Sequence, residues 1–213
     1  MAFFNRYAIT TKLIILNVVL FIVFMSLIAF RVVPLEFIAV RPSDILAGKN
    51  LWTLITSMFM HGGIMHLFVN MFSLFFMGNL TERILGAKRY VLFYLGAGVF
   101  SSLAYVFSAL IPMFNETLNM PAVGASGALF GVVGTLMVLT PNLPVYVMLI
   151  PIPIKLKYAA PGLLALLWLI SVGGNIPIGN IAHLAGLIAG LGYGFYVRKR
   201  FPRKTKRIKR MFS

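Results

Sequence analysis

Side chains able to carry out acyl-transfer chemistry stand at the start of three apolar segments. Ser126 lies in the sequence GASG at 124–127, His183 precedes a glycine-rich run, and His66 is followed one helical turn later by Asn70. A serine hydroxyl beside an imidazole is a nucleophile with its general base. Donors on one helix face, such as His66 and Asn70, can stabilise the oxyanion that acyl transfer develops. These residue types predict hydrolysis by a serine nucleophile if the fold brings them together.

Glycines at helical spacing indicate how the two central groups could meet. Glycines four residues apart follow both reactive side chains: Gly127 and Gly131 after the serine, and Gly186, Gly190 and Gly194 after the histidine. Such faces let helix backbones approach closely in lipid. We therefore expect the Ser126 hydroxyl to lie within hydrogen-bonding reach of the His183 imidazole. Taken alone, the glycines would more simply indicate helix packing.

The scarcity of acidic residues limits this chemistry. The chain has four, all in predicted loops or at segment ends: Glu36, Asp44, Glu82 and Glu116. None lies on the segments that carry Ser126 and His183, so a Ser-His-Asp triad is not expected. A Ser-His dyad is the arrangement that remains.

The composition indicates what kind of fold must hold these groups. Of the 213 residues, 60% are hydrophobic and 11% are charged, and the net charge is +15, whereas soluble domains are about 25% charged. This excludes a soluble enzyme and a disordered protein, and the absence of cysteine excludes a disulfide scaffold and thiolate chemistry. About 128 apolar residues leave room for about six membrane spans of about 20 residues each.

We predict an all-α integral membrane protein built as a six-helix bundle. The predicted spans cover residues 13–30, 61–78, 90–111, 124–140, 158–172 and 181–197. The proline-broken segment 143–154 is expected to be an extended or interfacial connection. The chain then divides into a cytoplasmic N-terminus at 1–12, the six-helix domain at 13–197 and a basic cytoplasmic tail at 198–213.

Basic residues predict the orientation, because cytoplasmic loops carry an excess of lysine and arginine. Sixteen of the 19 lie at the N-terminus, at 83–89, at 155–157 and in the tail, and three lie on the other side: Arg31, Arg41 and Lys49. Both termini are therefore expected in the cytoplasm. The stretch before Leu13 is too short for a transit peptide, which favours a plasma membrane over a mitochondrial one.

The tail holds nine of the basic residues, between Arg198 and Arg210. Its position directly after a span favours contact with anionic lipid headgroups. No base-stacking or groove-reading module accompanies it, so nucleic acid is not an expected partner.

Depth in the membrane supports a shared site. The second, fourth and sixth predicted spans all run inward from the external side. Ser126 and His183 each lie about 21 Å from the inner end of their spans, and His66 lies about 24 Å from Glu82, at 1.5 Å per residue. In a hydrocarbon core about 30 Å thick, all three lie within about 10 Å of the outer surface.

Four motifs follow one another along these spans. They are H-x-x-x-x-H-x-x-x-N at 61–70, G-x-x-x-E-x-x-x-G at 78–86, G-x-S-G at 124–127 and A-H-x-x-G at 182–186. Together they resemble the motifs of rhomboid intramembrane serine proteases, in that family's order and on that family's spans. The resemblance covers roughly residues 12–198.

The resemblance implies Ser126 as the nucleophile and His183 as the base. His66, Asn70 and the Ser126 amide would form the oxyanion hole, and Gly124, Gly127 and Gly186 belong to the motifs that support the dyad. The implied substrates are single-pass membrane proteins, cut near the external face beside small residues and helix-weakening residues. No cofactor or metal is implied.

The resemblance also implies two supporting roles and shows two departures. His61 would order the first loop, and Glu82 would hold the inner end of the second span. Thr53 stands where many members have arginine, which affects a first-loop contact. Phe130 stands where many have tyrosine, so its ring can still pack on His183 without the hydroxyl.

Three other readings compete with a protease. A catalytically inactive rhomboid-like binder would use the same groove without hydrolysis, although Ser126 and His183 are both present. A small transporter would show inverted repeats and charges at mid-membrane, and neither is evident. A zinc site made by the three histidines would be known chemistry, but the H-E-x-x-H motif of membrane metalloproteases is absent.

Overall fold

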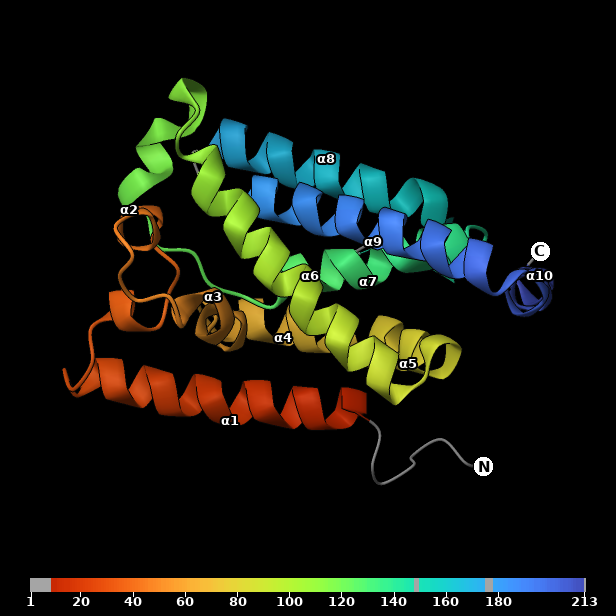
Figure 1. The fold of residues 1–213 in the computed structure, drawn as a ribbon, viewed down its shortest axis with the longest axis horizontal. Coiled ribbons are helices and arrows are strands. Elements are labelled where there is room, and N and C mark those ends of the chain that lie inside the picture. Colours follow the sequence, from red (N-terminus) through yellow and green to blue (C-terminus); the bar gives the residue numbers. More distant parts are fainter. Residues whose placement is uncertain (1–8, 148–149, 175–177, 213) are drawn as a thin grey trace.

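Long helices packed side by side make up the computed structural model, which describes residues 9–147, 150–174 and 178–212 (Figure 1). The long helical elements are α1 (Ile9–Ala29), α4 (Ile64–Ser73), α5 (Asn79–Leu85), α6 (Ala87–Ser108), α7 (Ser126–Leu139), α8 (Leu156–Gly174) and α9 (Asn180–Arg200). A π-helical turn, η3 (Leu74–Gly78), joins α4 to α5, so that 64–85 forms one span.

Five helices among the described residues have the length and hydropathy to cross a membrane. They are α1, the continuous helix Ile64–Leu85, α6, α8 and α9, with 19 to 22 residues each. The fourth predicted span is α7, which has only 14 residues and is about 21 Å long at 1.5 Å per residue. A multi-pass membrane protein is therefore supported, whereas six spans and the side of each terminus stay predictions.

Helix α7 is buried inside the bundle rather than exposed on it. Eleven of its 14 residues are buried, and Figure 1 shows it between α6 and α9. A helix enclosed by protein on its sides does not need the full length of a lipid-facing span, because its neighbours cover its apolar surface. The short fourth element is thus the core of the fold.

The other helices begin and end within a few residues of the predicted spans, except that the second continues to Leu85, seven residues beyond the predicted end at Gly78. Helix α1 starts at Ile9, four residues before the prediction, and α6 starts at Ala87, three residues before it. Helix α9 continues to Arg200, beyond the predicted end at Val197, because basic side chains at the last turn favour the helix C-terminus. The first turn of α1 and the last turn of α9 lie at the same end of the bundle (Figure 1).

Short elements fill the connections. Between α1 and α4 lie η1 (Leu35–Phe37), α2 (Pro42–Leu46), α3 (Thr53–Thr56) and η2 (Ser57–Phe59), and before α7 lies η4 (Pro112–Asn119). The connection predicted to be extended at 143–154 contains β1 (Pro144–Val145) and β2 (Ile154–Lys155), which pair antiparallel. Part of it, 148–149, lies outside the described residues, and so do residues 175–177 between α8 and α9.

The basic tail contains a helix that the sequence does not predict. Helix α10 (Pro202–Met211) follows α9 after a single non-helical residue, Phe201. Proline at its first position suits a helix start, because the missing N–H is one of the groups that has no helical partner there. Its buried residue is Thr205, which bonds the carbonyls of Phe201 and Pro202.

Candidate active site

The hydroxyl of Ser126 and the imidazole of His183 lie in direct contact. Ser126 Oγ is 2.8 Å from His183 Nε2. Ser126 is the first residue of α7, and His183 lies in the first turn of α9. Two polar groups at matching helix starts thus meet, which is the geometry that a serine nucleophile and its general base require.

Glycines bring these two helices together. A Cβ on Gly186 would collide with the carbonyl oxygen of Gly127, and a Cβ on Gly190 would collide with that of Gly131. Thr135 adds a hydrogen bond across the interface, from Oγ1 to the Gly190 carbonyl at 3.2 Å. The spacing of glycines read from the sequence therefore corresponds to a backbone-to-backbone contact directly below the dyad.

The imidazole of His183 is held from one face and left unpaired at one nitrogen. Its ring stacks on Phe130, with centroids 4.8 Å apart and planes 25° apart, and the residue is 8% exposed. Its Nδ1 is buried and has no hydrogen-bond partner among the described residues. Phe130 can orient the ring through its face although it has no hydroxyl, and no carboxylate of the described residues bonds Nδ1 to complete a triad.

His66 stands beside Ser126 with its proton position set by the backbone. The amide of Gly62 donates to His66 Nδ1 at 3.2 Å, so the neutral ring carries its hydrogen on Nε2. A Cβ built on Gly124 would lie 3.0 Å from this Nε2 and 3.6 Å from Ser126 Oγ. The Nε2–H group of His66 therefore faces the space next to the serine, where a donor could stabilise an oxyanion.

Gly124 has to be glycine for two reasons. Its φ of +125° is a backbone conformation that side chains rarely adopt, and a Cβ would meet the His66 ring. Its amide donates to the Ser57 carbonyl at 2.9 Å. Two further hydrogen bonds, between Val40 and Ala122, tie the first loop to the strand-like segment before α7.

Asn70 lies one turn below His66 and is 4% exposed. Its side-chain amide donates to the His66 carbonyl at 2.8 Å. Among the described residues, the structure places it in no hydrogen bond with Ser126 or His183. A side-chain amide has two hydrogens, so one stays available for a substrate group.

His61 is fully buried and lies against aromatic rings rather than at the dyad. Its ring contacts Phe21 edge-on, with centroids 6.2 Å apart, and His66 at 5.2 Å. It therefore fills the space between α1 and the first turn of α4. The three histidines do not converge on one point: among the described residues, no group of three His, Cys, Asp or Glu side chains is placed to hold a metal ion.

Glu82 lies far from the dyad, at the start of α1. Its carboxylate accepts hydrogen bonds from the backbone amides of Ile9 and Thr10, both at 2.8 Å, and from the Thr10 hydroxyl at 2.7 Å. A negative group at a helix N-terminus satisfies amides that have no helical partner and interacts favourably with the helix dipole. Glu82 thus fastens the C-terminal end of the second span to the start of α1.

Ser101 on α6 belongs to the site's support, although sequence reasoning did not single it out. It is 2% exposed, and a Cβ on Gly127 would lie 2.6 Å from the Ser101 Cβ. Its hydroxyl bonds the Ala97 carbonyl of its own helix at 2.7 Å. The signal in the sequence is the run of small residues in the third span, which includes Gly96 and Gly98.

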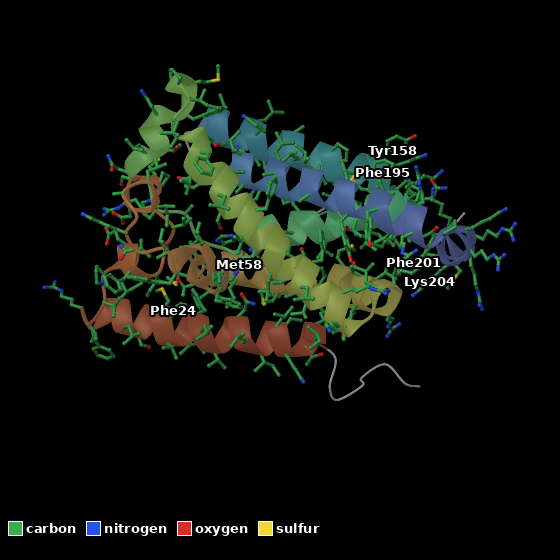
Figure 2. The ribbon with its side chains drawn as sticks, viewed as in Figure 1. Phe24, Met58, Tyr158, Phe195, Phe201 and Lys204 are labelled. Atoms are coloured by element: carbon green, nitrogen blue, oxygen red, sulfur yellow. The ribbon has the colours of Figure 1, made fainter. Side chains whose placement is uncertain are left out.

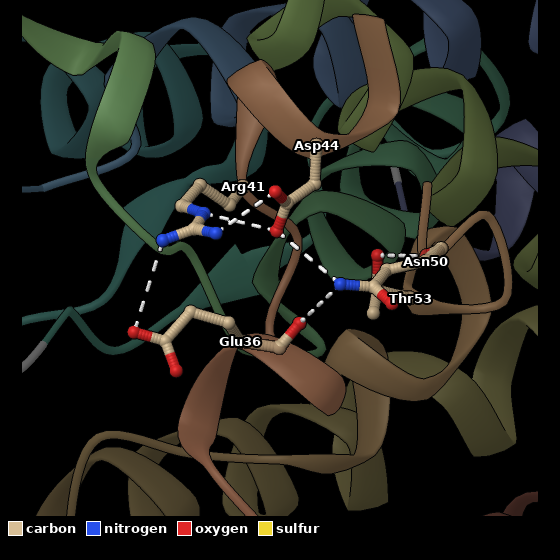
Figure 3. A network of polar contacts seen from close by, with 5 residues as sticks. All are labelled: Glu36, Arg41, Asp44, Asn50 and Thr53. Carbon is tan, nitrogen blue, oxygen red and sulfur yellow. Dashed lines mark hydrogen bonds and ion pairs between the residues drawn. The ribbon is translucent and has the colours of Figure 1, made fainter. Parts of the chain in front are cut away.

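The first loop is held by a polar network around Asp44 (Figure 3). Arg41 donates two hydrogen bonds to the Asp44 carboxylate, at 2.8 and 2.9 Å, and this guanidinium lowers the pKa of Asp44 from its ordinary value. Asn50 donates to Asp44 at 3.3 Å and to the Glu36 carbonyl at 3.4 Å. Thr53, buried, donates to the Asn50 carbonyl at 2.7 Å. Thr53, which stands where many members of the resembled family have arginine, thus closes a local turn with Asn50.

The sequence is similar to a known protein family and to several of its members. Residues 48–200 match the Rhomboid domain. The chain is 32% identical to Rhomboid protease GluP of Bacillus subtilis over 154 residues, which are 70% of this chain and 27% of that protein. It is 34% identical to RHOMBOID-like protein 1 of Arabidopsis thaliana over 170 residues, 76% of this chain and 39% of that protein.

A third relative is Rhomboid protein 1, mitochondrial, of Saccharomyces cerevisiae, which is 31% identical over 159 residues, 73% of this chain and 44% of that protein. The chain thus spans between about a quarter and a half of the length of these relatives. The matched region includes α4 to α9 and both residues of the Ser126–His183 pair. The chain belongs to the rhomboid family.

Proposed function

We propose that this protein is an intramembrane serine endopeptidase in which Ser126 is the nucleophile and His183 is the general base. The observation that carries the proposal is the 2.8 Å contact between Ser126 Oγ and His183 Nε2. The tight glycine contact of α7 with α9 supports it, because the contact fixes both helix starts.

Attack would begin when His183 Nε2 accepts the proton of the Ser126 hydroxyl while Oγ bonds to the substrate carbonyl carbon. The same imidazole then gives this proton to the leaving amine as the C–N bond breaks. Water, deprotonated by His183, releases the acyl group and restores the serine. The buried Nδ1 of His183 carries a hydrogen throughout, and Phe130 keeps the ring plane in position.

The negative oxygen of the tetrahedral intermediate would be stabilised by three kinds of donor. The Nε2–H group of His66 faces the space beside the serine. The amide of Ser126 opens α7, where backbone N–H groups have no helical partner. Asn70 supplies the second hydrogen of its side-chain amide. Removing one such donor from a serine protease costs about 100- to 1,000-fold in rate.

The proposed substrates are membrane segments of single-pass proteins, cut near the external face. A helical segment has its amides bonded internally, so it must partly unwind before Ser126 can reach a carbonyl. We further propose that α7 completes a bundle of six helices, with both termini in the cytoplasm and the protein in a plasma membrane. The count of sixteen basic residues against three supports this orientation.

A cleavage assay tests the proposal. The purified protein is reconstituted in vesicles with a single-pass reporter, and the wild type is compared with Ser126→Ala. We expect cleavage by the wild type and a loss of at least 1,000-fold in the variant, because the nucleophile is removed. Equal cleavage by both proteins would refute the dyad.

A matched control shows whether the loss is specific to Ser126 or follows the replacement of any serine by alanine. Ser26 is exposed on α1, and its hydroxyl bonds the Ile22 carbonyl of its own helix. Ser26→Ala should keep full cleavage and full labelling by a fluorophosphonate, whereas Ser126→Ala should lose both. A wild type that neither cleaves nor reacts with the fluorophosphonate would favour the inactive binder instead.

A further inference from the structure

A cavity of about 580 Å³ lies at the end of the bundle away from the dyad. It forms where the last turn of α9, helix α10 and the α5–α6 junction meet, and Figure 2 labels Phe201 and Lys204 at this end. Its floor is apolar and buried, with Ile84, Leu85 and Val197 no more than 7% exposed. This volume is in the range of small-molecule binding sites.

Three basic side chains from three helices line the cavity. They are Arg89 of α6, Arg200 of α9 and Lys204 of α10, and no acidic residue is among the lining residues. In the part of the chain that the structure describes, none of the three forms an ion pair. The Arg89 guanidinium lies 4.8 Å from the centroid of the Phe201 ring, which holds it in place. Three like charges around one space attract an anion.

An apolar groove continues from this cavity along the bundle. The groove, of about 540 Å³, runs between α6 and α9 and shares Tyr193 and Tyr196 with the cavity. Gly96 and Gly192 line it, and at both positions no atom lies within 4 Å of where a Cβ would be. Gly192 is eight residues from Arg200, or about 12 Å along the helix. The groove therefore leads from the charged end toward the middle of the bundle.

We propose that the cavity and the groove together bind one anionic glycerophospholipid of the surrounding membrane. Its phosphate would lie among Arg89, Arg200 and Lys204, and one acyl chain would lie in the groove over Gly96 and Gly192. A phosphate group needs cationic donors, and an acyl chain needs an open apolar channel. The structure provides both, joined end to end.

This site differs from a general attraction of the basic tail to anionic membranes, to which each lysine or arginine near the surface contributes. Arg89 belongs to α6 rather than to the tail, and the groove is uncharged. The site is also separate from proteolysis, because Arg200 is 17 residues from His183, or about 26 Å along α9.

Binding is tested on the purified, delipidated full chain in neutral detergent by native mass spectrometry. Dioleoyl phosphatidylglycerol is titrated against dioleoyl phosphatidylcholine. We expect one phosphatidylglycerol to bind at least tenfold more tightly than phosphatidylcholine. The triple variant Arg89→Gln, Arg200→Gln, Lys204→Gln should lose at least tenfold of this affinity. Equal affinity for the two lipids would overturn the proposal.

The matched control changes the same charge on the same end of the molecule. Arg203, Lys206 and Arg207 are exposed residues of α10 that do not line the cavity. The triple variant Arg203→Gln, Lys206→Gln, Arg207→Gln should keep phosphatidylglycerol affinity within about threefold. An equal loss of affinity in both triple variants would show that the lipid is attracted only by the overall positive charge of this end, and it would overturn the proposed site.

The groove is tested separately from the headgroup. Gly192→Leu should lower phosphatidylglycerol affinity at least threefold, because its side chain enters the groove, whereas Gly162→Leu on α8, also open around its Cα, should leave it unchanged. Glycerol phosphate, the headgroup without chains, should fail to displace the lipid at equal concentration. Displacement by glycerol phosphate, or no effect of both Gly192→Leu and Gly96→Leu, would show that a soluble anion occupies the cavity and that the lipid proposal is wrong.

Discussion

Helix α9 presents glycines to two neighbouring helices, and the two contacts differ. Toward α7, Gly186 and Gly190 lie directly on backbone carbonyls of Gly127 and Gly131, so that a methyl group at either position has no room. Toward α6, Gly192 faces open space. It lies six residues after Gly186, about 120° around the helix at 3.6 residues per turn.

The difference shows that small residues do two separate things in this molecule. On the α7 side they remove side-chain volume so that two backbones touch, which brings Ser126 to His183. On the α6 side they leave an open apolar groove. Small-residue spacing thus indicates where helices can approach, while the neighbouring helix decides whether they do.

The largest effect is expected from Gly186→Ala. The added Cβ would collide with the Gly127 carbonyl, a backbone atom that cannot rotate away, and would lie 3.0 Å from Ser101 Oγ. Overpacking of this kind costs about 1–3 kcal/mol, and a misplacement of about 1 Å at a catalytic group costs about 100-fold in rate. Reporter cleavage should therefore fall about 100-fold, with a lower temperature of thermal unfolding in detergent.

The control for this variant is Gly162→Ala on α8, where no atom lies within 4 Å of the new Cβ. It should cleave and unfold like the wild type. If Gly186→Ala kept wild-type cleavage, the tight contact below the dyad would not position the two catalytic groups.

A smaller loss, of about tenfold in cleavage, is expected from Gly127→Ala, together with a second change that should reverse it. The new Cβ would lie 2.6 Å from the Ser101 Cβ and 2.9 Å from its Oγ. Ser101→Gly removes both atoms, so the double variant Gly127→Ala, Ser101→Gly should recover part of the lost activity. Cleavage rates of the two single variants and the double variant measure this coupling. Strictly additive losses would mean that α6 does not press on α7 at this point.

Part of this arrangement could be predicted from residue spacing alone. The glycines beside Ser126 and His183 repeat every four residues, and one helical period is enough to align them on a face. The lack of an acidic residue on those segments also predicted that no carboxylate accompanies the pair, and Nδ1 of His183 has no partner among the described residues. These features depend on residues that are near one another in the sequence, and so they can be predicted from the sequence and helical periodicity alone.

Other parts depend on contacts between distant segments and could not be predicted. The tautomer of His66 follows from the Gly62 amide, whose direction is set by loop geometry. The 14-residue length of α7 is tolerated because other helices enclose it, whereas the sequence predicted a fourth span over residues 124–140. Helix α10 bonds through Thr205 to Phe201, and Ile208 packs against the core. These few less polar residues are surrounded by basic ones, so hydropathy alone does not reveal the helix.

A more modest effect is expected from Thr135→Val, which tests the α7 contact without adding volume. The substitution removes hydrogen bonds from Oγ1 to the carbonyls of Gly190, at 3.2 Å, and Gly131, at 3.1 Å. Hydrogen bonds between membrane helices are worth about 0.6 kcal/mol on average. Thermal or denaturant unfolding should show a loss of about this size, with cleavage within about threefold of the wild type. A loss above about 2 kcal/mol would mean that the bond, rather than the glycine contact, holds the helices together.

The smallest effect is expected from Gly192→Ala, and its meaning comes from a comparison with Gly190→Ala two residues earlier on the same helix. The two substitutions are chemically identical, and alanine favours a helix over glycine by about 1 kcal/mol. At Gly190 this gain is outweighed, because the Cβ would meet the Gly131 carbonyl and lie 2.9 Å from the Gly134 Cα. At Gly192 nothing opposes it, so the unfolding temperature should stay equal or rise slightly, with cleavage within about twofold of the wild type. Both variants change helix propensity by the same amount, so any difference in unfolding temperature between them measures the packing of α9 against α7. Equal unfolding temperatures would show that the two faces of α9 do not differ in how tightly they pack.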